Sequence, residues 1–307
     1  MNWIKKSEGF LLLFFTFFCW GSIYVAGRLV PELPSVLVAG LRCGVAVAPL
    51  LLMTRKYRGI KIRREDYKYF FCVGSLGYFL TICLIQEGIS RTGASMASLI
   101  NSLTPVGVTI CAALLLKEKI TPVKIFCLFL AVAGTWVITS NVTAQGELLG
   151  IFMVLCSIVS WSFASVFMRR LTATYPAIMV TAYGMLFSLV FHVPVSVYTV
   201  IREGGVAFTP KSVAVILYLG LIGSCLAQFS WTASLARIPA STCALFYPLQ
   251  PTFSAILGAL ILKETFAPTF FIGMVLIGAD VILSALETRR LSRQAEKEKM
   301  GAVTENH

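Results

Sequence analysis

The chain has 307 residues, of which 57% are hydrophobic and 13% are charged, and it carries a formal net charge of +12. A soluble domain has about a quarter of its residues charged, so this composition excludes a single soluble enzyme domain and a disordered chain. The nine cysteines lie within apolar stretches without paired spacing, which favours small buried side chains over disulfides or a zinc site. We therefore expect an all-α polytopic membrane protein that needs no cofactor and no metal.

Apolar runs separated by Pro, Gly and charged residues predict ten transmembrane helices. In chain order they cover residues 9–27, 34–53, 68–88, 93–116, 122–140, 148–168, 176–201, 212–236, 240–262 and 266–286. We expect residues 1–8 and the polar tail 287–307 to lie outside the membrane. The first run follows two lysines, as a secretory signal does, but it is longer and lacks a small-x-small cleavage site, so we interpret it as a retained helix.

Lys and Arg are distributed unevenly between alternate connections. Most of them lie at the N-terminus, in the basic loop 55–64, near 117–119, at 169–170 and in the tail. Because cytoplasmic loops carry such an excess, we expect both termini in the cytoplasm. This asymmetry explains the positive charge, so we expect no nucleic-acid partner. The basic loop can also touch anionic lipid headgroups, although topology alone accounts for it.

The chain contains an internal repeat. Residues 94–118 and 240–264 align without a gap at an offset of 146, and 11 of the 25 positions are identical, including a proline and the final Lys-Glu pair. Near the N-terminus an offset of 141 pairs Trp20 with Trp161. Apolar composition alone does not produce such a run, so we infer a duplication.

Each predicted repeat holds five helices, an odd number, so the second repeat enters the membrane in the opposite orientation. We therefore predict two inverted five-helix repeats, the first over 9–140 and the second over 148–286. Many secondary transporters are built in this way, with the substrate site near the bilayer midplane between the repeats. The sequence has no GxxxxGK[ST] motif, so we do not expect ATP to be the direct energy source.

Several of these residues also carry a family resemblance. Trp20-Gly21-Ser22, Arg42, the mid-helix prolines and the Lys-Glu endings of helices 4 and 9 resemble the EamA-like branch of the drug/metabolite transporter superfamily. The resemblance covers residues 9–286 and implies a ten-helix carrier of amino acids, drugs or metabolites. The chain departs from that branch at Gln86-Glu87-Gly88, where a small uncharged pair is usual, so the resemblance implies no particular substrate.

Polar and aromatic side chains at mid-membrane depth are the candidates for substrate contact. Arg42 can attract an anionic group of the substrate or, alternatively, cap carbonyl groups of a neighbouring helix. Its repeat equivalent is Tyr183, so the two halves differ at this position. The remaining candidates are Ser22, Tyr24, Tyr78, Gln86, Asn101, Trp161, Gln228, Trp231, Tyr247 and Gln250. The set suits a small amphipathic organic solute, and helix packing is the alternative role for each member.

Three ionisable side chains are candidates for proton coupling. They are Glu87 near the outer end of helix 3, Asp280 towards the cytoplasmic end of helix 10, and His192 in helix 7. The alternatives are a solvated carboxylate at Glu87, a wet or paired carboxylate at Asp280, and a structural histidine. Glu118 and Glu264, at helix ends, are expected to make interhelical contacts or to close a gate.

Pro105 and Pro251 are expected to kink helices 4 and 9 near the midplane, because proline removes a backbone hydrogen bond. Such kinks either line a cavity with freed carbonyl groups or are purely structural. Their recurrence in both halves favours the first role.

The sequence therefore predicts a secondary active transporter of the plasma or bacterial inner membrane. We expect it to export small organic solutes, such as amino acids or related metabolites, by alternating access. The alternative is a membrane-embedded enzyme or a receptor that acts on a lipid or small ligand. The sequence shows no paired acids, histidine cluster or GxSxG nucleophile to support an enzyme. The expected partners are the solute and the lipid bilayer; oligomeric state does not follow from the sequence.

Overall fold

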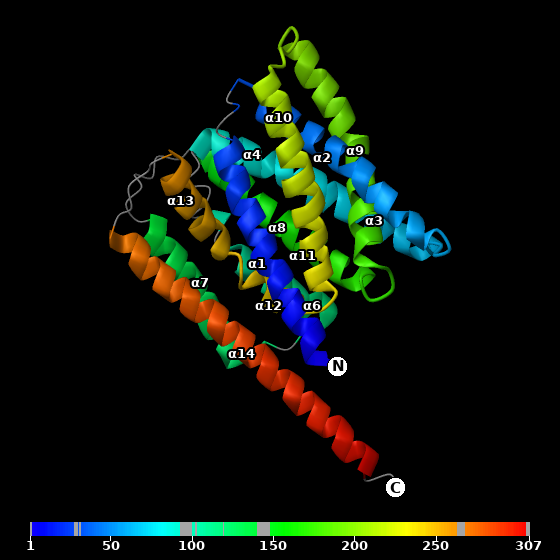
Figure 1. The fold of residues 1–307 in the computed structure, drawn as a ribbon, viewed down its shortest axis with the longest axis vertical. Helices are drawn as coiled ribbons and strands as arrows, with labels where there is room; N and C mark the ends of the chain where they lie inside the picture. Colours follow the sequence, from blue (N-terminus) through cyan, green and yellow to red (C-terminus); the bar gives the residue numbers. More distant parts are fainter. Residues whose placement is uncertain are drawn as a thin grey trace.

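The structure, a computed structural model, describes residues 2–27, 30, 32–92, 100–101, 103–118, 120–139, 148–262 and 268–304. Within these ranges the chain is helical and contains no strand. The helices pack into a bundle, and the long α14 runs along one side of it and beyond it (Figure 1).

The helices follow the predicted spans. In the first half they are α1 (Asn2–Gly27), α2 (Ser35–Thr54), α3 (Tyr67–Cys72), α4 (Thr81–Thr92), α6 (Thr104–Leu116) and α7 (Pro122–Thr139), with short 3₁₀ turns η1 (Arg55–Tyr57) and η2 (Arg64–Asp66) after α2. In the second half they are α8 (Leu148–Leu171), α9 (Ala177–Arg202), α10 (Pro210–Tyr218), α11 (Ala227–Leu235), α12 (Ala240–Ala244), α13 (Leu249–Leu262) and α14 (Pro268–Thr304).

The helices are apolar enough to lie in a bilayer. Among the residues that the structure describes, six stretches meet the length and hydropathy of a membrane span, and three shorter apolar helices accompany them. Large apolar side chains point outward, with Leu114 74% exposed and Val275 72% exposed. Such faces need lipid around them. The chain is therefore an all-α, polytopic integral membrane protein.

A π-helical stretch joins α3 to α4, and another joins α10 to α11. The first, η3, covers Val73–Leu80, and the second, η4, covers Leu219–Leu226, so they are separated by the same offset as the sequence repeat. A Cβ at Gly74 would lie 2.5 Å from a backbone oxygen of α9, and one at Gly220 would lie 2.6 Å from Val45 of α2. Glycine is needed at both positions because the helices approach so closely.

Equivalent helices of the two halves pack as antiparallel pairs. In the pair α7 and α14, Cys127 Sγ lies 3.7 Å from the backbone oxygen of Asp280, whereas Gly134, later in α7, contacts Gly273, earlier in α14. The helices α2 and α9 also pack in opposite directions. These contacts join the first half of the chain to the second over a large part of the bundle.

The predicted ninth helix is not continuous. Residues 245–248 form a turn between α12 and α13. Pro105 lies in the first turn of α6 and Pro251 is the third residue of α13, and the kinks expected at these prolines stay a prediction. A proline in a first turn removes no helical hydrogen bond, so both residues begin a helix.

Some of the predicted residues lie outside the described part of the chain, and the polar tail is more helical than the sequence predicted. Glu264 lies outside the described residues, and so does the side chain of Tyr24. The polar tail, predicted as 287–307, continues α14 as a helix to Thr304.

Candidate functional site

An aromatic cluster is buried where α1, α8, α11 and the turn between α12 and α13 meet. The rings of Trp20, Trp161 and Trp231 lie with centroids 5.7 to 6.1 Å apart. Tyr247 lies 5.6 Å from Trp231, and Phe17 lies 5.0 Å from Tyr247. All five side chains are at most 7% exposed. We call these five residues the aromatic cluster.

Polar atoms beside these rings are left without partners. The indole N–H groups of Trp161 and Trp231, the Oε1 atom of Gln228 and the hydroxyl of Ser165 have no hydrogen-bond partner among the described residues. Helical spacing puts Ser165 on the face of Trp161, and Gln228 on the face of Trp231. A buried unpaired polar group costs about 1–3 kcal/mol, so this arrangement favours a solute that brings both hydrogen-bond acceptors and a donor.

The structure brings together only part of the predicted substrate set. Trp161, Trp231 and Tyr247 are in the aromatic cluster, and Gln228 lies beside it. Trp20 is a member that the site prediction missed, although its pairing with Trp161 in the repeat was a usable signal. Phe17, the other missed member, is one apolar aromatic residue among many, and no sequence pattern marks it.

Arg42 is half-buried and joins α2 to η4. Its Nε atom donates a 2.7 Å hydrogen bond to Ser224 Oγ, and a Cβ at Gly223 would lie 3.6 Å from its Nη2 atom. Tyr183, its repeat equivalent, lines a different pocket, at the far end of α2. The two positions therefore occupy different environments.

Tyr78 is fully buried in η3, and its hydroxyl lies 3.9 Å from Met168 Sδ. Met168 also contacts Thr232 Oγ1, at 3.8 Å, so it connects η3 to α11. The backbone oxygen of Tyr78 lies 2.9 Å from His192 Nε2, and the His192 ring packs edge-on against Phe79.

Four other predicted residues make local contacts. Ser22 shares a 2.7 Å hydrogen bond with Tyr218 of α10, and Asn101 Oδ1 accepts a 3.1 Å hydrogen bond from Thr104. Gln86 and Gln250 are half-buried in α4 and α13.

The proton-coupling candidates lie in three different environments. Glu87 forms a 2.9 Å ion pair with Arg91 one turn later, and both side chains are about one-third exposed. His192 is buried, with Nε2 engaged and Nδ1 without a partner among the described residues. Asp280 is fully buried between α7 and α14, and neither carboxylate oxygen has a hydrogen-bond partner in the described ranges. Whether Asp280 takes part in proton coupling stays a prediction.

Glu118 ties the end of α6 to the start of α12. Its carboxylate accepts hydrogen bonds from Ala240 N at 2.9 Å, Ser241 N at 3.2 Å and Ser241 Oγ at 2.6 Å. The buried Lys124 donates from Nζ to the same Ser241 hydroxyl at 2.8 Å. Lys117 ends α6 in the left-handed conformation, with φ of 55°, which turns the chain towards α12. We call these interactions the Glu118 contact.

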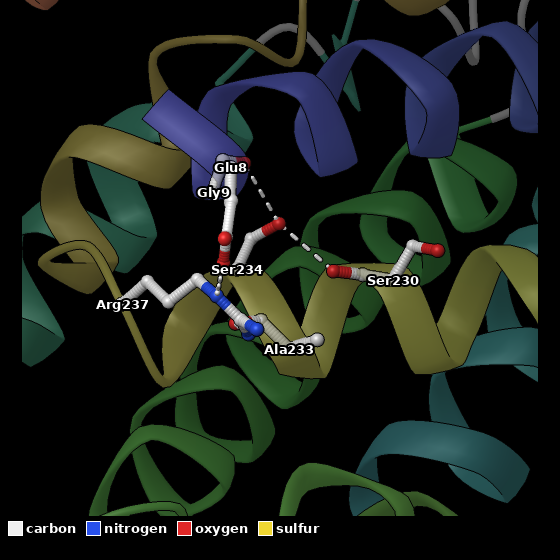
Figure 2. A network of polar contacts seen from close by, with 6 residues as sticks. All are labelled: Glu8, Gly9, Ser230, Ala233, Ser234 and Arg237. Atoms are coloured by element: carbon white, nitrogen blue, oxygen red, sulfur yellow. Dashed lines mark hydrogen bonds and ion pairs between the residues drawn. The ribbon is translucent and has the colours of Figure 1, made fainter. Parts of the chain in front are cut away.

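A second polar network lies at the same end of the bundle, where α1 meets α11 (Figure 2). The Ser234 hydroxyl is 3.1 Å from the backbone oxygen of Gly9 and 2.8 Å from that of Ser230. Arg237 pairs with Glu8 at 3.4 Å. Arg169 of α8 donates to the backbone oxygen of Leu235 in α11. This end of the bundle is therefore held by several polar contacts between helices.

A helical bundle of this kind, with buried aromatic rings beside polar groups that lack partners among the described residues, fits a small-molecule transporter. The chain belongs to the EamA-like transporter family, whose model matches residues 7–140 and again residues 148–286. The resemblance seen in the sequence is thereby confirmed.

Named relatives agree with this assignment, and a solved structure shares the fold. The chain is 25% identical over 281 residues to the "Uncharacterized transporter YetK" of Bacillus subtilis (strain 168), covering 88% of this chain and 84% of YetK. It is 27% identical over 297 residues to the "Probable terminal-alkyne amino-acid exporter" of Streptantibioticus cattleyicolor, covering 95% and 98%. A crystal structure with 19% sequence identity has the same fold, with a TM-score of 0.79 over 93% of this chain and 99% of that chain.

Proposed function

We propose that the protein is a secondary active transporter that exports small amphipathic organic solutes, such as amino acids or related metabolites. It works by alternating access between two inverted five-helix repeats, and it is not an enzyme. The observation that carries the proposal is the aromatic cluster with its unpaired N–H and amide groups, because both halves of the chain contribute to it.

Three observations support the inverted repeat. The paired helices α7 and α14 run in opposite directions, and so do α2 and α9. The π-helical stretches η3 and η4 recur at the repeat offset. The family model matches the chain twice. A duplication with an odd number of spans accounts for all three.

The chemistry of the cluster supports the solute class. Indole and phenol rings offer apolar faces to a hydrocarbon or aromatic part. The N–H groups of Trp161 and Trp231 can donate to a carboxylate or carbonyl, and the Oε1 atom of Gln228 can accept from an amine. No Lys or Arg belongs to the cluster, which disfavours a phosphorylated solute. A relative named as an amino-acid exporter supports the same class.

The Glu118 contact supports a gate at the cytoplasmic end. The distribution of basic residues puts the end of α6 on the cytoplasmic side. A solute that enters the aromatic cluster from the cytoplasm must pass between α6, α12 and their neighbours, so the Glu118 contact has to break in each cycle. With the contact formed, the protein is closed to the cytoplasm.

Asp280 is our candidate for the residue that binds and releases the coupling proton. A buried ionised carboxylate without partners costs several kcal/mol, so binding and release of a proton at Asp280 changes the free energy of the α7–α14 pair. Glu87, by contrast, is already paired with Arg91, and His192 is engaged by Tyr78.

The proposal is tested by flux into liposomes that contain the purified protein. Radiolabelled amino acids and apolar amines are presented with and without a pH gradient, and protein-free liposomes give the background. Saturable uptake that unlabelled solute inhibits is expected for at least one amphipathic solute. Absence of flux across the panel, together with a soluble product formed from any added solute, would instead favour the enzyme alternative.

A further inference from the structure

A pocket of about 560 Å³ lies apart from the aromatic cluster, where the end of α2 and the turn η1 meet α9. Its walls come from Leu51 and Leu52 of α2, from Arg55, Tyr57 and Arg58, and from Tyr183 of α9. The basic loop begins at Arg55, so the expected topology puts this pocket at the cytoplasmic surface of the membrane.

The pocket carries two cationic side chains that are not neutralised. Within the described ranges, neither Arg55 nor Arg58 forms an ion pair. The nearest acidic residues in the chain are engaged elsewhere, because Glu65 lies 3.8 Å from Arg63 and Asp66 accepts a 2.6 Å hydrogen bond from Tyr175. A backbone hydrogen bond from Arg58 N to Arg55 O closes the turn that carries both guanidinium groups.

The pocket is also lined by apolar side chains of α2, among them Leu51 and Leu52. Leu52 is 54% exposed, and the neighbouring Met53 is 45% exposed. Tyr57 and Tyr183 line the pocket as well, and aromatic residues of this kind are enriched at membrane interfaces. The pocket thus combines two guanidinium groups with apolar and aromatic side chains.

We propose that this pocket binds one anionic phospholipid of the cytoplasmic leaflet. Arg55 and Arg58 hold the phosphate through charge-assisted hydrogen bonds, for which the planar guanidinium is well suited. The acyl chains lie along Leu51 and Leu52. The lipid contacts both α2 and α9, which are repeat equivalents that must move relative to each other in alternating access. The bound lipid therefore modulates transport without entering the solute pathway.

The proposal is tested on the full-length protein in nanodiscs by native mass spectrometry and thermal unfolding. Nanodiscs of phosphatidylcholine are compared with nanodiscs that also contain phosphatidylglycerol. We expect one phosphatidylglycerol to stay bound and to raise the unfolding temperature. The R55Q/R58Q variant should retain it roughly 30-fold less, since each basic residue near the surface contributes about fivefold.

Three further measurements distinguish binding of an intact lipid by Arg55 and Arg58 from a general effect of positive charge and from binding of free phosphate. The variant R289Q/R290Q removes two exposed arginines from the same predicted membrane face and should retain the lipid like the parent chain. R55K/R58K keeps the charge and, if folded, should retain it partly. Soluble glycerol phosphate, added to phosphatidylcholine nanodiscs, should give no shift. Equal retention by R55Q/R58Q and the parent, or a full shift with glycerol phosphate alone, would overturn the proposal.

Discussion

The aromatic cluster and the Glu118 contact are both junctions between the two halves of the chain. They differ in whether their polar atoms have hydrogen-bond partners. At the Glu118 contact one carboxylate accepts three hydrogen bonds, and a buried lysine shares the same serine. Beside the aromatic cluster, two indole donors and an amide oxygen have no partner in the described part of the chain. Satisfied polar atoms stabilise one conformation, whereas unsatisfied ones favour binding of a ligand.

The largest effect should come from Glu118→Ala. The change removes three charge-assisted hydrogen bonds and leaves Lys124 buried without its nearest carboxylate, so we expect a loss of about 3–5 kcal/mol in the free energy of unfolding. Thermal unfolding in detergent measures the loss. The double variant E118A/K124A should lose less than the sum of the two single variants. Additive losses would show that the two side chains do not interact.

Trp231→Phe should have a smaller effect than Glu118→Ala. It should weaken solute binding without lowering the free energy of unfolding. The ring stays in the cluster while the unpaired N–H group is lost, so we expect the solute to bind roughly tenfold more weakly with the unfolding temperature unchanged or raised. Liposome flux at several solute concentrations and thermal unfolding measure the two quantities. Phe70→Leu, at a fully buried aromatic residue of α3 outside the aromatic cluster, is the control. A stability loss without a change in solute affinity would assign Trp231 to packing alone.

Asp280→Asn tests whether the Asp280 carboxylate carries the coupling proton. The amide has nearly the same shape and cannot release a proton, so we expect the fold to be retained and the stimulation of flux by a pH gradient to be lost. Flux driven by a solute gradient alone is the internal control, and Glu87→Gln is the matched variant. If Asp280→Asn keeps its response to the pH gradient, Asp280 does not carry the proton.

The smallest effect should come from Tyr175→Phe, at the end of the bundle where the chain enters α9. Tyr175 donates to Asp66 at 2.6 Å and accepts from Arg63 N at 3.1 Å, so its loss should cost about 1 kcal/mol. Burial raises the pKa of the Tyr175 hydroxyl above its usual value of 10.0. Its contribution is therefore complete below pH 10 and falls as the pH rises further, because the unfolded chain then releases the proton more readily. Unfolding measured at neutral and alkaline pH should show a smaller alkaline loss in the variant.

The sequence predicted the helices well because apolar length is a strong signal of a membrane span. It could not predict the turn at 245–248, since nothing in the apolar run 240–262 marks a break except Pro248 and Pro251. Proline interrupts a helix either by kinking it or by starting a new one, and the sequence does not distinguish the two.

The site was harder to predict, because partners from distant helices decide each role. The sequence identified four residues at or beside the cluster as polar or aromatic residues at mid-membrane depth: Trp161, Trp231, Tyr247 and Gln228. Tyr183 was also a candidate, as the repeat equivalent of Arg42, but it lines another pocket. Lys124 was missed, since a lysine two residues into a predicted helix is ordinarily exposed at its end. In the structure it is 7% exposed, and its Nζ atom donates to Ser241 of α12.

The length of α14 has a mechanical consequence. Its 37 residues extend about 55 Å at 1.5 Å per residue, whereas the hydrocarbon layer is about 30 Å thick. The remaining rod projects from the bundle into the aqueous phase (Figure 1). A tilt of about 10° in the membrane would swing its free tip by roughly 4 Å. The tip near Thr304 thus moves by several ångströms when the α7–α14 pair rotates by so small an angle.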